Sequence, residues 1–272
     1  MDVESPVVLT SVPEGSLFAF PPVNVPFPQA PPAAGTPGLA SPPLFTIPEN
    51  IFYAALDPKV PITIAAVYAV TVKALNRYNR STNKRPWAIS KTRAFRAFVV
   101  LHNVFLAVYS AWTCHAMWRT LRSSVASPWG PAGYAGTADS LCRISGTPGL
   151  GEGTYYDQGL GRWTGLSENP ALTAEGLPSD TVGGRMWNDG LAWYGWIFYL
   201  SKFYEVIDTL IILAKGKPSS TLQTYHHAGA MMAMWAGIRY MAPPIWIFAF
   251  VNSGIHAMMV SSHRIPSIIR IY

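Results

Sequence analysis

Long apolar stretches separated by polar connections dominate the chain from about residue 60 onward. Five stretches stand out: 60–72, 97–118, 191–213, 222–241 and 245–260. A helix needs about 20 apolar residues to cross the hydrocarbon core of a membrane. The first stretch supplies only 13 clean residues, and it reaches that length, to about residue 78, if Lys73 and Arg77 extend toward the membrane surface. The pattern predicts an all-α fold, a polytopic membrane helix bundle with five membrane helices.

Two segments lie outside this pattern. Residues 1–48 hold 12 of the 24 prolines and little charge, and they show no helical period. We interpret them as disordered or polyproline-like, with a ligand for a proline-binding module as the alternative. Residues 119–189 are polar and rich in glycine, which indicates a long loop with short elements. The remaining chain, 49–272, is expected to form one membrane domain that contains this loop.

Composition supports a membrane protein. Half of the residues are hydrophobic and only 12% are charged, whereas a soluble domain has about 25% charged residues. The net charge of +6 raises the question of nucleic acid, but the basic residues flank apolar stretches instead of sharing one amphipathic face, so no nucleic-acid partner is expected. The two cysteines lack metal-ligand spacing. The N-terminus lacks the basic and apolar regions of a signal peptide.

The distribution of basic residues predicts an orientation. Residues 73–96 carry eight Lys or Arg, whereas 119–189 carry five Arg against seven acidic residues. The positive-inside rule places 73–96 in the cytosol and the long loop on the opposite side. Asn79 begins a glycosylation sequon in form, and this orientation leaves it unmodified. Cys114 and Cys142 fall on the oxidising side, where they are candidates for a disulfide.

Three charges interrupt the third stretch: Lys202, Glu205 and Asp208. A charge at the centre of a membrane helix costs roughly 2.5–3.5 kcal/mol on insertion scales, so it persists where it pairs or faces a polar cavity. Spacings of three and four residues place Lys202, Glu205, Asp208 and Thr209 along one stripe of a helix. A Lys–Glu pair that locks helix packing would explain two of them, but it leaves Asp208 without a partner.

Polar residues recur on the fourth and fifth stretches. Gln223, His226 and His227 share one helix face, and Asn252 and His256 share another. The predicted orientation places all of them in the cytosolic half, in one layer with the charged stripe. Such a layer is a candidate active site for cytosolic substrates. It could be a histidine-ligated metal centre or a metal-free acyl-transfer site. The chain has six histidines, two of them on the second stretch, and the residue types favour acyl transfer without a metal.

At these residues the chain resembles the ELO family of fatty acid elongases, the 3-ketoacyl-CoA synthases of the endoplasmic reticulum. The motif K-x-x-E-x-x-D-T is present as Lys202, Glu205, Asp208 and Thr209. The box H-x-x-H-H matches Gln223, His226 and His227, and N-x-x-x-H matches Asn252 and His256. The stretch LHNVFLAVYS (101–110), with Asn103, resembles the second-helix pattern. The resemblance covers about residues 50–259 and implies seven helices, six of them around a narrow acyl tunnel, of which five are expected here.

The resemblance implies a function in detail. The family condenses a long-chain acyl-CoA with malonyl-CoA and releases CO2, CoA and a 3-ketoacyl-CoA, without a cofactor. It implies that His227 is the nucleophile, that His226 and His256 assist decarboxylation or bind the enolate, and that Lys202, Glu205 and Asp208 position them. Gln223, Asn252, Thr209 and Asn103 would bind substrate. The implied surroundings are a multi-pass location in the endoplasmic reticulum membrane, membrane lipid, and the reductases and dehydratase of the elongation cycle as partners.

Two departures separate the chain from the family pattern. Gln223 replaces the first histidine of the box, as in some elongases of polyunsaturated substrates. Residues 260–263 stand where Y-x-Y-Y is expected, and the chain then stops. This predicts a C-terminus altered in the gene model, or a shortened protein, and a 272-residue chain that is unstable and inactive as written. The alternatives to an elongase are a membrane histidine-box oxidoreductase and an inactive truncated paralogue that acts as a binding protein.

Overall fold

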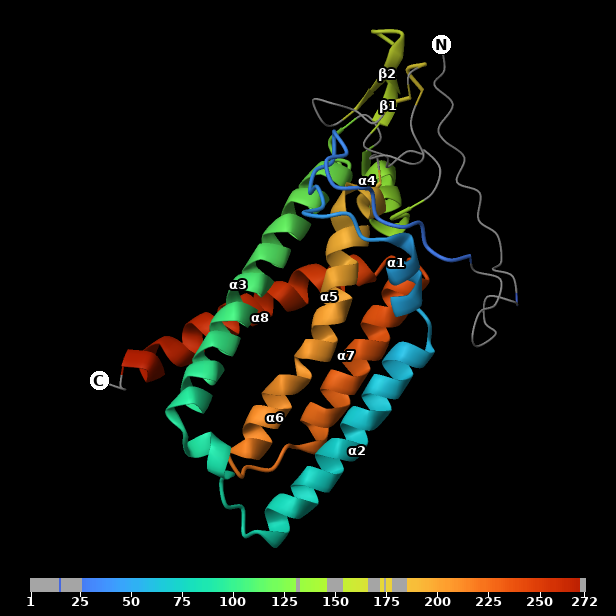
Figure 1. Ribbon diagram of the computed structural model, residues 1–272. Coiled ribbons are helices and arrows are strands. Elements are labelled where there is room, and N and C mark those ends of the chain that lie inside the picture. The colour runs from blue at the N-terminus through green and yellow to red at the C-terminus, as the bar shows by residue number, and fades with distance from the viewer. Residues whose placement is uncertain are drawn as a thin grey trace.

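The computed structural model is mostly helical, which agrees with the predicted all-α class (Figure 1). It describes residues 26–130, 133–145, 154–165 and 185–269, together with 15, 172, 173 and 175–177, with side chains up to Met258. The predicted disorder of residues 1–25 therefore lies almost entirely outside the described residues.

The predicted apolar stretches form helices at nearly the expected bounds. They are α2 (Lys59–Ser81), α3 (Arg93–Ser124), α5 (Ala192–Tyr204) with α6 (Val206–Ala214), α7 (Thr221–Arg239) and α8 (Ile245–Ile269). Within the described chain, α3 is long and apolar enough to cross a membrane, and α1 (Glu49–Ala55) with α2 is a second candidate, bent by 48°. Residues 245–258 of α8 form a shorter apolar helix. A count of five membrane spans therefore rests on the sequence pattern alone.

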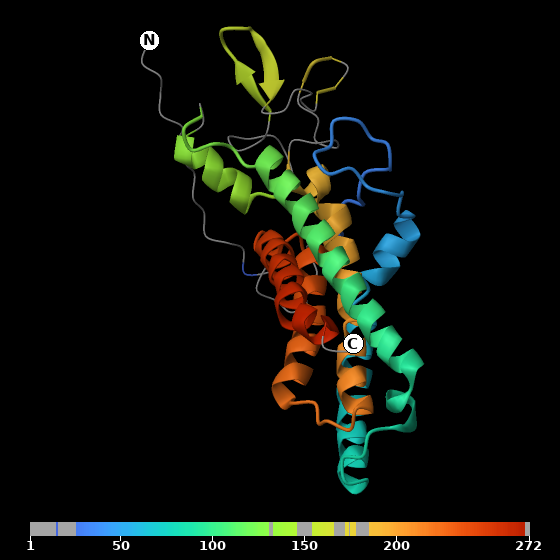
Figure 2. The same ribbon diagram turned by 90° about the vertical axis from the view of Figure 1, so that its left-hand side faces the viewer.

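The helices form one bundle in which α5 lies next to several others. α8 packs along α3, α2 packs along α7, and α5 contacts α3, α7 and α8. Two N-caps fix helix starts at the same end of the bundle: Thr92 Oγ1 accepts from Phe95 N at 3.1 Å before α3, and Ser220 Oγ accepts from Gln223 N at 3.1 Å before α7. Such caps satisfy backbone donors that have no partner within the helix. The view in Figure 2 shows α8 on one side of α3.

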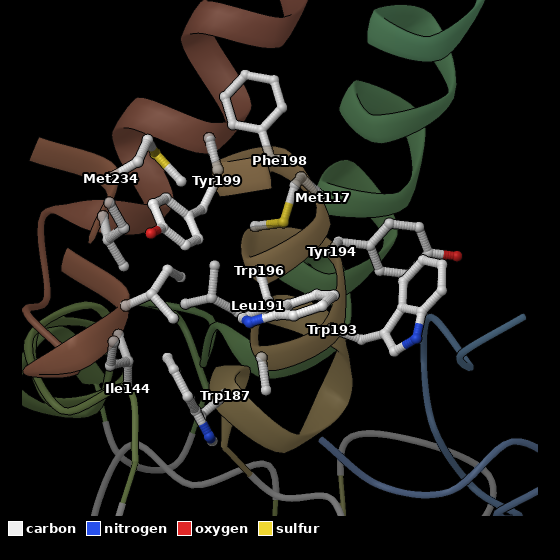
Figure 3. Packing of buried hydrophobic residues seen from close by; sticks show 14 of the residues in the cluster. Met117, Ile144, Trp187, Leu191, Trp193, Tyr194, Trp196, Phe198, Tyr199 and Met234 are labelled. Atoms are coloured by element: carbon white, nitrogen blue, oxygen red, sulfur yellow. The ribbon is translucent and has the colours of Figure 1, made fainter. Parts of the chain in front are cut away.

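Large aromatic side chains fill the half of the bundle that lies near the start of α5. Trp187, Trp193 and Tyr199 are fully buried, and they pack with Met117 of α3 and Met234 of α7 (Figure 3). Burial of each such side chain stabilises the fold by roughly 1.5–3 kcal/mol. This aromatic core packs the start of α5 against its neighbours. The charged residues lie at the opposite end of α5 and in α6.

Part of the expected loop 119–189 is built from short elements. α4 (Gly133–Cys142) follows α3, and β1 (Thr154–Asp157) pairs antiparallel with β2 (Arg162–Gly165). The π-helical turn η3 (Trp187–Leu191) leads into α5. The proposed disulfide is wrong, because both cysteines are free: Cys114 lies half-buried in α3 and Cys142 is exposed at the end of α4.

Residues 26–48, which we call the strap, lie against the bundle. Side-chain donors of the bundle bond to its backbone carbonyls: Trp187 Nε1 to Gln29 O and Trp193 Nε1 to Phe45 O at 3.0 Å, and Arg239 NH1 to Pro26 O at 2.9 Å. Prolines cannot donate a backbone hydrogen bond but their carbonyls accept one. Composition therefore predicted the extended backbone, but not the aromatic donors that hold it.

Connections at the opposite end brace one another. The 3-10 turn η2 (Ala88–Lys91) precedes α3, and Trp87 N next to it donates to Ala214 O at 2.9 Å. Asn76 Nδ2 donates to Ser219 O and Asn76 Oδ1 accepts from Ser219 N, both at 3.0 Å. These bonds join α2 and the α2–α3 connection to the end of α6 and the α6–α7 connection (bottom of Figure 1). The charged residues of α5 and α6 lie in this half of the bundle.

Candidate functional site

Lys202 and Glu205 form an ion pair inside the bundle. Lys202 Nζ lies 2.6 Å from Glu205 Oε1, and both side chains are almost fully buried. Lys202 Nζ also donates to Asn252 Oδ1 of α8 at 2.9 Å and lies 3.9 Å from the centre of the Phe198 ring. The three hydrogens of the ammonium group thus have a carboxylate, an amide oxygen and an aromatic face around them. Removing one member of such a buried pair typically costs about 3–5 kcal/mol, and the bond from Lys202 to Asn252 ties α5 to α8.

The helix is interrupted at the centre of the charged motif. α5 ends at Tyr204 and α6 begins at Val206, with Glu205 between them. The residues expected to form one stripe therefore point to different helices. Lys202 reaches Asn252 of α8, Asp208 reaches α3, and Thr209 reaches α2 and α7. One short segment thus connects to all four neighbouring long helices.

Asp208, for which the sequence offered no partner, pairs with a histidine of α3. His102 Nε2 lies 3.0 Å from Asp208 Oδ1, and the histidine side chain is completely buried. The other ring nitrogen, Nδ1, lies 3.0 Å from the hydroxyl of Tyr204. His102 lies on a different apolar stretch from Lys202, Glu205 and Asp208, so the spacing of the charged motif does not identify it as part of the site. Its spacing from Leu106 and Thr113, which are buried on the same face of α3, was the available signal.

Thr209 joins two further helices. Its hydroxyl lies 2.9 Å from the hydroxyl of Tyr68 on α2 and accepts from Gln223 Nε2 of α7 at 3.3 Å. The ring of Tyr68 meets the ring of His227 edge-on, with centroids 6.1 Å apart. Tyr68 was not recognised in the sequence, because a tyrosine in a short apolar stretch looks like an ordinary packing residue.

The three predicted histidines lie in different surroundings. His227 is buried, and its Nδ1 has no hydrogen-bond partner within the described residues. His226 is exposed on α7, with its ring centroid 5.6 Å from that of His227. His256 is half-buried on α8, one turn after Asn252. The hydrogen bonds from Lys202 to Asn252 and from Gln223 to Thr209 join α5 and α6 to α8 and α7 at this level.

Two buried oxygen atoms at this level also lack partners. Glu205 Oε2 and the hydroxyl of Tyr109 on α3 make no hydrogen bond to any residue that the structure describes. Buried polar groups in proteins are usually bonded, so unpaired ones that cluster are candidates for contact with a ligand or water. Together with His227 Nδ1, they give the layer both hydrogen-bond donors and acceptors.

Among the described residues, the side chain of Asn103 bonds within its own helix and not to this layer. Its amide donates to Val99 O within α3 at 2.5 Å, and its neighbour His102 makes the contact to α6 instead. In the part of the chain that the structure describes, no group of three or more His, Cys, Asp or Glu side chains is placed to hold a metal ion.

Comparison with known proteins identifies the family. Residues 53–261 match the family model described as ELO: GNS1/SUR4 family. The chain belongs to the ELO family. The matched region of this ELO chain contains all the polar residues of the layer, from Tyr68 to His256.

Individual relatives of this ELO chain carry elongase names. Fatty acid elongase sre1 of Dictyostelium discoideum is 35% identical over 82 residues, 30% of this chain and 29% of that protein. Fatty acid elongase 3 of Trypanosoma cruzi is 32% identical over 111 residues, 36% of each. Very long chain fatty acid elongase 3 of Homo sapiens is 28% identical over 80 residues, 29% of this chain and 30% of that protein. The matches thus span about a third of these relatives. No solved structure matches the chain.

Proposed function

We propose that this chain is a fatty acid elongase that condenses a long-chain acyl-CoA with malonyl-CoA to give a 3-ketoacyl-CoA, CO2 and CoA. The observation that carries the proposal is the convergence of Lys202, Glu205, Asp208, Thr209, His227 and Asn252 in one layer, within a region that matches the ELO family. We place the protein in the endoplasmic reticulum membrane as a multi-pass bundle, with the layer open to cytosolic acyl-CoA.

His227 is the proposed nucleophile. A ring nitrogen attacks the thioester carbonyl, an acyl–nitrogen bond forms, the carbon–sulfur bond breaks, and CoA leaves with a proton. Malonyl-CoA then loses CO2, and the resulting enolate carbon attacks the acyl group and releases the imidazole. A buried imidazole without a protein partner at Nδ1 suits this role, because neither substrate nor product has to displace an internal hydrogen bond there.

The neighbouring groups have complementary proposed roles. Because Lys202 donates to Asn252 Oδ1, the amide nitrogen of Asn252 is directed away from Lys202 and is a donor for a developing oxyanion. Gln223 is held by Thr209 and lies one turn before His227. His256 and His226 are proposed to assist decarboxylation. The reductases and dehydratase of the elongation cycle are the proposed partners.

The test is an elongation assay. Microsomes that contain the chain, with its C-terminus continued to the family pattern, receive a long-chain acyl-CoA and malonyl-CoA labelled at C2, and the 3-ketoacyl product is quantified. His227→Ala is expected to lower the rate by at least about a thousandfold, because the step has no substitute nucleophile. His115→Ala, on an exposed face of α3, is the matched control and should retain activity. Near-full elongation by His227→Ala would remove the nucleophile assignment.

A second variant tests the charged motif. Asp208→Asn preserves the shape of the side chain and removes its charge. The neutral amide is easier to place in a membrane than the carboxylate. Expression should survive while elongation falls. If Asp208 only stabilised helix packing, Asp208→Asn would change the stability of the protein and leave the elongation rate per folded molecule the same. The oxidoreductase alternative has no supporting observation among the described residues.

A further inference from the structure

His102 has no role in the reaction proposed above, yet both of its ring nitrogens are engaged. The imidazole lies between Asp208 Oδ1 and the hydroxyl of Tyr204, 3.0 Å from each. Phe98 stacks on the imidazole with ring centroids 6.0 Å apart, and Phe105 packs edge-on against Tyr204 at 5.4 Å. These aromatic rings cover the outer side of the pair, where α3 exposes apolar side chains. The polar chain Tyr204–His102–Asp208, with a buried histidine between two half-buried residues, is therefore shielded on one side and joined to the layer on the other.

For an ionised Asp208 and a neutral His102, the chemistry of the three groups fixes the direction of each hydrogen bond. An ionised carboxylate accepts and cannot donate, so Nε2 of His102 carries the hydrogen in its bond to Asp208. In the neutral ring Nδ1 is then an acceptor, and the hydroxyl of Tyr204 donates to it. Tyr204 thus selects the tautomer of His102 that holds Asp208. A carboxylate oriented by a histidine whose other nitrogen is bonded is a common way to fix a ligand or catalytic group.

Asp208 links this chain to the proposed nucleophile. Its side chain is 31% exposed, so one oxygen is anchored to His102 while part of the carboxylate stays accessible. The next residue, Thr209, bonds to Tyr68, whose ring meets that of His227. We propose that His102 is a positioning residue of the elongase site, which holds the Asp208 carboxylate in one orientation while Tyr204 selects the required tautomer. This inference rests on the proposed function and adds two residues to its site.

The experiment compares replacements of His102 that differ in one property. His102→Phe keeps a planar ring and removes the donor, whereas His102→Gln keeps an N–H donor near the position of Nε2. His102→Phe should lower kcat by about 10–100-fold, as loss of an orienting partner commonly does, with KM for acyl-CoA changed less than about twofold. His102→Gln should recover most of that loss. His115→Phe, the same exchange on an exposed face of α3, is the control.

A double-mutant cycle shows whether His102 acts through Asp208. In an Asp208→Asn background, His102→Phe should reduce kcat by less than about twofold, because the group that it positions is already altered. Equal loss in His102→Phe and His102→Gln, or a full further loss in the Asp208→Asn background, overturns the proposal. If the chain with its C-terminus continued to the family pattern elongates no acyl-CoA, the proposed function fails. The parent chain, His102→Phe, Asp208→Asn and the double variant then test the contact between His102 and Asp208 by thermal unfolding. If the two substitutions lower the unfolding midpoint independently of each other, the contact is absent and the proposal is overturned.

Discussion

Asn79 illustrates, at the scale of one residue, how burial changes the meaning of a sequence motif. Its Nδ2 donates to Leu213 O and its Oδ1 accepts from Trp87 Nε1, both at 2.8 Å. The side chain is buried although it begins a sequon in form. An amide with both ends bonded inside the fold is not available to a glycosyltransferase. Absence of a glycan at Asn79 would therefore reflect burial, and it does not report the orientation of the chain.

We predict that Asn79 is unmodified and that it stabilises the fold. Asn79→Ala removes the acceptor of Trp87 Nε1 and one of the two donors to Leu213 O, which Gly216 N also reaches, and this should cost about 1–3 kcal/mol of unfolding free energy. Ser81→Ala removes the same sequon from an exposed position and should cost much less. Thermal unfolding in detergent compares the two. A glycosidase-sensitive mass shift at Asn79, or equal midpoints for both variants, would contradict the prediction.

Asp189, which precedes the apolar stretch 191–213, is a buried carboxyl that the proposed reaction does not use. Burial raises the pKa of Asp189 from 3.8 to about 6, although the Ser124 hydroxyl, 2.7 Å from Oδ2, opposes the shift. The folded state therefore binds this proton more tightly than the unfolded state does. Its stabilising effect is complete below about pH 4 and is lost as the pH rises through 6.

We predict that unfolding midpoints of the wild-type chain fall as the pH rises from 4 to 7. A shift of about two pH units corresponds to about 3 kcal/mol. The amide introduced by Asp189→Asn cannot ionise, so this variant should show a weaker pH dependence. Its unfolding midpoint should exceed that of the wild-type chain by the largest amount near pH 7. Glu49→Gln, at an exposed position in the first turn of α1, is the control and should leave the slope in place. A slope unchanged by Asp189→Asn would show that this carboxyl does not contribute to it.

At the scale of elements, the strap is the part of the fold that composition described least well. It packs over the start of α5, where Ser41 N donates to Asp189 O at 3.0 Å and Ser41 Oγ donates to Ala116 O at 2.7 Å. Gly190 is required there, because a Cβ would lie 2.5 Å from Thr120 Oγ1 and 2.9 Å from Ser41 Cβ. The strap therefore fixes the start of the helix whose other end carries Lys202.

We predict that the strap stabilises the bundle. Deletion of residues 2–42 removes the acceptors of Trp187, Tyr194 and Arg239. Several losses of about 1 kcal/mol each should lower the thermal midpoint by about 5 °C or more. Deletion of residues 2–25 is the control, because the bonds described here begin at Pro26. If both deletions give the same midpoint, the strap contacts carry no stability.

The elements also show what the sequence could and could not predict. The long helices followed from apolar runs, and the grouping of α5, α7 and α8 followed from their polar positions. The break at Glu205 was not predictable, because each side of it has a helical pattern. The partners of Asp208 and Thr209 lie 106 and 141 residues away in the chain. The folded structure is needed to identify such pairs, because the local sequence around one partner does not indicate which distant residue it contacts.

For the whole molecule, the orientation predicted from basic residues has a reporter that the structure supplies. Cys142 is free and exposed at the end of α4, and Figure 1 places α4 at the end of the bundle opposite to the α2–α3 connection. In sealed microsomes of a Cys114→Ala chain, a membrane-impermeant maleimide should label Cys142 only after permeabilisation. Ser81→Cys, exposed near the α2–α3 connection, should react without it in a Cys114→Ala, Cys142→Ala chain. The reverse pattern would invert the orientation.

The brace between the two connections has a consequence for how the molecule is made. Asn76 and Ser219 are 143 residues apart in the chain, so at about 5–20 residues per second the ribosome needs roughly 7–29 s to reach the second after the first. During this interval α2 is already synthesised, and Tyr68, Asn76 and Asn79 have none of their partners from α6 or the α6–α7 connection. Unpaired polar groups in a nascent helix are costly in lipid. If the protein is the multi-pass bundle proposed above, we expect α2 to depend on the insertion machinery to retain it until the later helices are complete.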